Sequence, residues 1–121
     1  MLNNILFNGH TYRVAFKHYT ESKMHPGTTC AVQQMLNPNR AEGEKSLWIA
    51  VAAGSTRRNP LDTLNRPVGR ELSLTRALRH VEKGLRNEIL RMYYGRKKRA
   101  RSVIPEWAKA KILRERLLWT Q

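Results

Sequence analysis

The residues of this chain that could do chemistry are mostly arginines and lysines. The 121 residues include 23 Lys and Arg against 9 Asp and Glu, a formal net charge of +14. Such an imbalance bears on partners rather than on fold, because a strongly positive surface attracts phosphates or clustered carboxylates. Residues 66–121 hold 16 basic and 5 acidic residues, whereas residues 1–65 hold 7 and 4. We therefore expect an anionic partner that is contacted mainly by the C-terminal half.

Three groups of cations stand out along the chain, and each could bind phosphate or carboxylate. Guanidinium forks bind phosphate bidentately, and each phosphate neutralised releases counterions, so such binding is strongly salt-dependent. Tyr94 precedes the last group and could stack on a base. The alternative interpretation of each group is solvated surface: an exposed loop, the outer side of a helix and an exposed linker. The groups are an arginine-rich connection (Arg57, Arg58, Arg66), a helical face (Arg76, Arg79, Lys83, Arg86, Arg91) and a basic run (Arg96, Lys97, Lys98, Arg99, Arg101).

No pattern in the sequence indicates catalysis. Phosphate-binding glycine loops, the GxSxG nucleophile turn and histidine pairs at metal-ligand spacing are all absent from it. Glu71, Glu82 and Glu88 interleave with arginines, where ion pairs along a helix explain them. We therefore expect a protein that is not an enzyme, with no cofactor, no metal and no small-molecule substrate.

Cys30 is the only cysteine, so no intrachain disulfide can form. We expect it to be a small buried residue of a strand in a protein of a reducing compartment. The chain does not open with a basic segment followed by an apolar one, and no run approaches the roughly 18 apolar residues that span a bilayer. The expected location is the cytoplasm, without membrane contact.

A hairpin is predicted at the start of the chain. Asn8-Gly9 favours the positive φ angles of a type I′ turn. With this two-residue loop, Phe7 faces His10 and Ile5 faces Tyr12. Because side chains alternate between the two faces of a strand, one side of the hairpin is apolar and the other polar. The apolar side holds Ile5, Phe7, Tyr12, Val14 and Phe16, and the polar side Thr11, Arg13, Ala15 and Lys17.

Two further strands complete a predicted sheet within residues 1–54. Residues 29–36 form the third strand, with Cys30, Val32 and Leu36 on one side. Residues 47–53 are almost wholly apolar, which is typical of a central strand, and Gly54 ends the run.

The C-terminal half predicts two helices that cover one face of this sheet. An arginine-rich loop, residues 55–69, leads into one long helix, residues 70–94. Gly84 costs about 1 kcal/mol relative to alanine inside it, but the apolar period continues, so we expect a continuous helix. A basic linker, residues 96–104, and a terminal helix, residues 105–120, complete a single α+β domain, residues 1–121, of order ββββαα. The apolar stripes are Leu74, Leu78, Val81, Leu85, Ile89 and Met92 in the long helix, and Trp107, Ala110, Leu113 and Leu117 in the terminal one.

Residues 54–78, about a fifth of the chain, carry a resemblance. Asn59-Pro60-x-Asp62, then Gly69-Arg70 and Arg76-Ala77-Leu78, resemble small basic phage-encoded accessory proteins in which a sheet leads into a helix of the form GRxxAxxRAL. Ser73 stands where that pattern has alanine. The resemblance implies a phage protein of the host-takeover type in the host bacterial cytoplasm, including inhibitors of host nucleic-acid enzymes or of antiphage defence. It assigns no catalytic residue.

Two functions are consistent with these observations. In the first, the helical face and the basic run contact nucleic acid, and the protein is a non-enzymatic phage-type nucleic-acid-binding protein. In the second, the same basic surface binds an acidic surface of a host protein complex, as an anti-CRISPR-like defence inhibitor or an inhibitor of transcription would. The sequence does not distinguish DNA from RNA.

Overall fold

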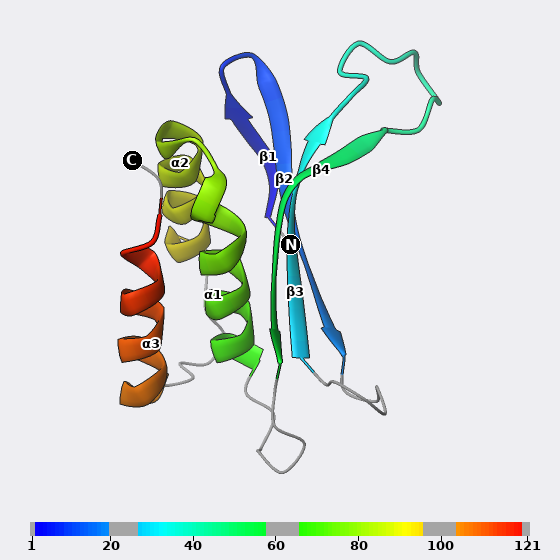
Figure 1. Ribbon diagram of the computed structural model, residues 1–121. Coiled ribbons are helices and arrows are strands. Elements are labelled where there is room, and N and C mark those ends of the chain that lie inside the picture. Colours follow the sequence, from blue (N-terminus) through cyan, green and yellow to red (C-terminus); the bar gives the residue numbers. More distant parts are fainter. Residues whose placement is uncertain (1, 20–26, 58–65, 96–103, 120–121) are drawn as a thin grey trace.

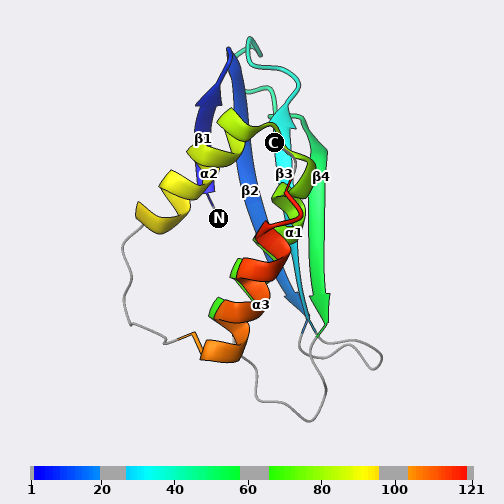
Figure 2. The same ribbon diagram turned by 60° about the vertical axis from the view of Figure 1, so that its left-hand side comes forward.

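The computed structural model describes residues 2–19, 27–57, 66–95 and 104–119, which form an α+β fold. Four antiparallel strands, β1 (Leu2–Phe7), β2 (His10–Tyr19), β3 (Gly27–Met35) and β4 (Trp48–Arg57), make one sheet in the order β1-β2-β3-β4. Three helices follow, α1 (Arg66–Ala77), α2 (Lys83–Gly95) and α3 (Glu106–Arg116), with a short 3-10 turn, η1 (Leu78–His80), after α1. The helices all lie on one side of the sheet, and no described element covers its other face (Figures 1 and 2).

The predicted hairpin is confirmed. Asn8 and Gly9 both have positive φ angles, 49° and 78°, as a type I′ turn requires. Ile5 lies opposite Tyr12 and Phe7 opposite His10. This register places Ile5 and Tyr12 on the helix side of the sheet, where both are buried.

The third strand is confirmed, and the fourth differs from its prediction. Cys30 and Val32 are buried as expected, but Leu36 is exposed because β3 ends at Met35. The apolar run predicted as a central strand ending at Gly54 is an edge strand that continues to Arg57. Gly54 permits a close approach of α1, since a Cβ there would lie 2.4 Å from the Ser73 carbonyl oxygen. The connection between β4 and α1 is shorter than the predicted loop, residues 55–69, because residues 55–57 belong to β4 and α1 begins at Arg66.

The prediction of one continuous helix is wrong. The chain leaves the helix at η1 and becomes extended at Val81, with φ −80° and ψ 141°. This break lets α1 pack on β3 and β4 while α2 packs on β1, which a single straight helix could not do. Gly84 is not the cause of the break: it lies in the first turn of α2, where an added Cβ would come within 2.7 Å of the Phe7 ring.

The prediction for the terminal helix has the wrong face buried. Ala108 and Ile112 are buried against the rest of the helical layer, whereas Trp107 and Leu117 are 63% and 84% exposed. The core cluster is formed by residues of the sheet, α1 and α2, with Trp119 packed against it, and α3 itself packs on α1. None of the described helices is long and apolar enough to cross a membrane.

Candidate nucleic-acid interface

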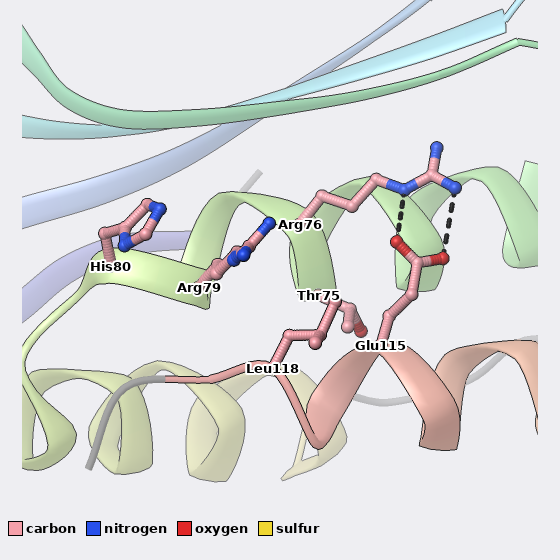
Figure 3. A pocket seen from close by; sticks show the side chains of 6 residues that line it. All are labelled: Thr75, Arg76, Arg79, His80, Glu115 and Leu118. Atoms are coloured by element: carbon pink, nitrogen blue, oxygen red, sulfur yellow. Dashed lines mark hydrogen bonds and ion pairs between the residues drawn. The ribbon is translucent and has the colours of Figure 1, made fainter.

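The cations predicted to form one helical face are dispersed in the structure. Arg76 joins three elements: its Nε and Nη2 donate to the carboxylate of Glu115 on α3 at 2.7 and 3.0 Å, and its Nη1 donates to the Ser55 carbonyl oxygen of β4 at 2.9 Å. Figure 3 shows this pair beside a pocket of about 310 Å³ between α1 and α3. Arg76 therefore fastens α3 and β4 to α1, and its charge is largely balanced by Glu115.

The clearest departure from the predicted basic helical face is Arg86. It was expected on the exposed face, but it is only 5% exposed. Its guanidinium carbon lies 4.8 Å from the ring centroid of Trp119, and Arg116 lies 5.2 Å from the same centroid. The indole nitrogen of Trp119 donates to the Thr75 carbonyl oxygen at 2.7 Å. Trp119 covers Arg86 after the end of α3, so Arg86 stabilises the packing of the C-terminal segment.

The remaining predicted residues of the helical layer lie at its surface. Arg91 donates to Glu88 at 2.9 Å, and this hydrogen bond holds the pKa of the Glu88 carboxyl below its usual value. The Tyr94 hydroxyl donates to Glu71 at 2.8 Å and accepts from Arg116, and burial raises its pKa. Arg79 and Lys83 are exposed. The acidic neighbours of this layer therefore offset part of its positive charge.

Of the other predicted site residues, Arg57 ends β4 and Arg66 begins α1. Arg58 and the basic run Arg96, Lys97, Lys98, Arg99 and Arg101 lie outside the described residues.

The uncovered side of the sheet gathers residues that sequence reasoning assigned to separate elements. Opposite residues of neighbouring strands share a face, so Arg13 of β2 lies beside Gln33 of β3, and Tyr19 is in one row with Gly27 and Arg57. A register shift after Val32 brings Met35 opposite Trp48. We call the following set the open face: Arg13, Ala15, Lys17, Tyr19, Thr29, Ala31, Gln33, Trp48, Ala53, Ser55 and Arg57.

The open face has cations but no carboxylates of its own. The four strands hold Arg13, Lys17 and Arg57 and contain no Asp or Glu at any position. The acidic residues of the described helices, by contrast, lie among the arginines and lysines of that layer. An anion approaching the sheet from its uncovered side therefore meets positive charge that no strand carboxylate offsets.

Two cations of the open face are paired with aromatic rings. The guanidinium carbon of Arg13 lies 4.2 Å from the Trp48 ring centroid, and its Nε donates to the Gln33 side-chain oxygen. The ammonium of Lys17 lies 5.2 Å from the Tyr19 centroid. Between the two pairs lies a row of Ala15, Ala31 and Ala53. The centre of the face is thus flat, with a cation and a ring towards each end.

Further cations collect where β2 and β4 end and α1 begins, at the lower end of the sheet in Figure 1. His18 hydrogen-bonds Thr28 at 2.8 Å. Burial lowers the pKa of His18, and the positive charges of Arg70 and Arg66 lower it further. His18 has the same parity along β2 as Tyr12 and Val14, so Arg66 and Arg70 belong with it to the helix side of this end of the sheet and not to the open face.

The described residues give little support for a metal site or for a nucleophilic cysteine. Within the described ranges no three His, Cys, Asp or Glu residues are grouped so that they could hold a metal ion. Burial raises the pKa of the Cys30 thiol to about 12, which makes it a poor nucleophile at neutral pH. Comparison of the chain with protein-family models, curated proteins and solved structures found no match.

The open face could be recognised only in part from sequence. The alternation of β2 predicted a polar side that includes Arg13 and Lys17, and this side is indeed the uncovered one. Trp48 and the position of Arg57 on a strand were missed, although Arg57 was itself predicted as a binding residue of a loop, because the apolar composition of β4 resembled that of a buried central strand ending at Gly54. The only signal that could have found them was the same period-two alternation continued through Ser55 and Arg57.

Proposed function

We propose that this chain is a non-enzymatic, phage-type nucleic-acid-binding protein of the cytoplasm, and that it binds its ligand on the open face. The observation that carries this proposal is the combination of three cations and two aromatic rings on one uncovered face of a sheet whose strands contain no carboxylate. Phosphate groups satisfy the cations, and the flat bases suit the rings. The carboxylates of an acidic protein would pair with the cations, but they do not account for the flat row of alanines between the two rings.

Electrostatics supplies most of the affinity in this proposal. Arg13, Lys17 and Arg57 lie on the open face, where phosphates of the ligand would meet them. Each phosphate neutralised on a single strand contributes about 0.7 to the slope of log K against log salt. Loss of the three strand cations should therefore lower the magnitude of that slope by about 2.

The test compares two variants that lose the same charge from opposite sides of the molecule. One replaces Arg13, Lys17 and Arg57 by glutamine, and its matched control replaces Arg79, Lys83 and Arg91 on the helical layer. Fluorescence anisotropy with labelled DNA and RNA oligonucleotides, across salt concentrations, measures both. We expect at least a tenfold loss of affinity for the open-face variant and less than a threefold loss for the control. A larger loss for the control would return the site to the helical face, and equal losses would show that binding follows total charge; either result contradicts a site on the open face. No binding by the unmodified protein would overturn the proposal.

A protein partner is the second candidate function, and the outer side of α3 favours it. Trp107, Leu113 and Leu117 are exposed there and form the α3 stripe. At helical spacing Lys109 and Lys111 flank this stripe and Arg114 lies within it. A convex apolar stripe between cations fits an apolar groove rimmed by carboxylates. A host defence or transcription complex could provide such a groove.

This second candidate has its own test. Leu113→Glu with Leu117→Glu places two carboxylates on the α3 stripe without touching the core. A host protein that copurifies with the unmodified chain, is lost with this variant and forms a complex from purified components would support the candidate. Retention of that protein by the variant would exclude the α3 stripe as its binding site.

A further inference from the structure

We propose that the open face binds single-stranded nucleic acid in preference to duplex, with one base stacked at the Arg13–Trp48 pair and another at Tyr19. This inference rests on the proposed function and narrows its ligand to a chemical class: unpaired nucleotides of DNA or RNA.

The width of the sheet argues against binding in the major groove of a duplex. Neighbouring strands are spaced about 4.8 Å apart, so the axes of the outer two of four strands are separated by about 14 Å before side chains are added. The major groove of B-DNA is about 12 Å wide and admits a helix or a two-stranded ribbon. A four-stranded face is therefore too wide to enter the major groove of undistorted B-DNA, where its aromatic rings would reach no base.

The Arg13–Trp48 pair is prepared for stacking. Trp48 comes from β4 and Arg13 from β2, and Gln33 on the intervening strand accepts a hydrogen bond from the Arg13 Nε. The guanidinium is thereby fixed over the indole, 4.2 Å from its centroid. Unpaired bases stack on both aromatic rings and guanidinium planes. The pair offers a base such a surface at little cost in side-chain entropy, because its side chains are already ordered.

The second pair, Lys17 and Tyr19, differs from the first because a glycine lies beside its ring. Tyr19 and Arg57 belong to the same row, and the residue between them is Gly27. Gly27 has no side chain, and one could not be added, because a Cβ would lie 2.0 Å from the Thr56 carbonyl oxygen. No side chain therefore stands between Tyr19 and Arg57 in this row, and a base lying on Tyr19 would have Lys17 beside the ring and Arg57 across Gly27 to bind the adjoining phosphates.

The spacing of the two pairs sets the length of the ligand. Arg13 and Tyr19 are six positions apart on β2, or about 20 Å at roughly 3.3 Å per residue. Stacked nucleotides rise about 3.4 Å each, so the face spans about six stacked nucleotides and fewer extended ones. Across this distance the alanine row presents no side chain that would lift a strand away from the sheet.

Cross-strand stabilisation is the competing explanation of both pairs. Cation–aromatic contacts on a sheet contribute to stability without any ligand. That explanation predicts that removing the rings changes the melting temperature and leaves the preference for single strands unchanged. The two explanations therefore differ in a measurable quantity.

The experiment measures anisotropy at one salt concentration with ten-nucleotide oligothymidine and oligouridine probes and with a ten-base-pair duplex. We expect the single strands to bind at least tenfold more tightly than the duplex. Trp48→Leu and Tyr19→Leu keep the charge of the face, and each should lose at least fivefold in single-strand affinity while duplex affinity stays within twofold. Trp107→Leu, on the far side of the molecule, is the matched control and should change neither single-strand affinity nor duplex affinity.

Arg13→Lys provides a variant that does not depend on the stability of the aromatic substitutions. It keeps the charge and loses the planar group, so single-strand affinity should fall at least threefold with an unchanged salt slope. Equal affinity of the unmodified protein for single strands and duplex would overturn this inference and leave the proposed function standing. Unchanged single-strand affinity in folded Trp48→Leu, Tyr19→Leu and Arg13→Lys variants would overturn it as well. Failure to bind any of the three probes would instead overturn the proposed function.

Discussion

Gly54→Ala tests the packing that holds the helical layer on the sheet. The Cβ of an alanine there would lie 2.4 Å from both the Ala77 nitrogen and the Ser73 carbonyl oxygen, and 2.8 Å from the Arg76 carbonyl carbon. All three are backbone atoms of α1, so no side-chain rotation can relieve the overlap. Either α1 must move away from β4 or β4 must bend away from α1.

The size of the effect follows from this geometry. Overpacking a core costs typically 1–3 kcal/mol, and overlap with three backbone atoms of α1 places this site at the upper end. Replacing glycine in a strand returns about 0.5–1 kcal/mol, because alanine loses less conformational freedom on folding. The net destabilisation should therefore be about 2 kcal/mol, which at about 4 °C per kcal/mol lowers the melting temperature by roughly 8 °C.

Chemical denaturation followed by circular dichroism measures this prediction, with Gly95→Ala as the matched control. Gly95 ends α2 and has no atom within 4 Å of an added Cβ, so its substitution should change the free energy of unfolding by less than about 0.5 kcal/mol. A Gly54→Ala variant as stable as the control would refute the close approach of α1 to β4.

Two further predictions concern titratable groups. The pKa of His18 is lowered by burial and by Arg70 and Arg66, so the unfolded chain binds the proton more tightly than the folded one. The contribution of His18 to the free energy of unfolding should therefore be fully present above the unfolded pKa of about 6.5, and it should be lost as the pH falls below that value. Thermal melts between pH 7.5 and 5 should show this loss, and His18→Gln should reduce the slope; an unchanged slope would contradict the assignment. The Cys30 thiol, buried and with a pKa of about 12, should resist an aromatic disulfide reagent at pH 8 in the native protein and react fully in denaturant, whereas fast native labelling would show that the core opens readily.

Local signals in the sequence predicted the sheet well. Asn8-Gly9 fixes a turn through backbone sterics alone, and the alternation of β2 then assigns Val14 and Arg13 to opposite faces without any knowledge of the rest of the molecule. The class of fold follows, because an apolar sheet face needs helices to cover it.

The predictions that failed depended on contacts between distant residues. The apolar period through Gly84 is compatible with one straight helix, but covering both halves of the sheet requires the break at Val81. Arg86 is a charged residue that the sequence pattern assigns to the polar side of the helix, yet it is buried, with Trp119 from the C-terminal end over its guanidinium. At both places tertiary contacts, rather than local helix propensity, determined the structure.

The most direct test of the account maps the ligand onto the protein. Titration of isotopically labelled protein with the ten-nucleotide oligothymidine probe, followed by backbone amide chemical shifts, reports every residue separately. We expect the largest shifts along β2, β3 and β4, centred on Arg13, Ala31 and Arg57, and the indole signal of Trp48 should move while that of Trp119 stays in place. Shifts concentrated around Arg79, Lys83 and Arg91, with the strands unaffected, would contradict binding on the open face.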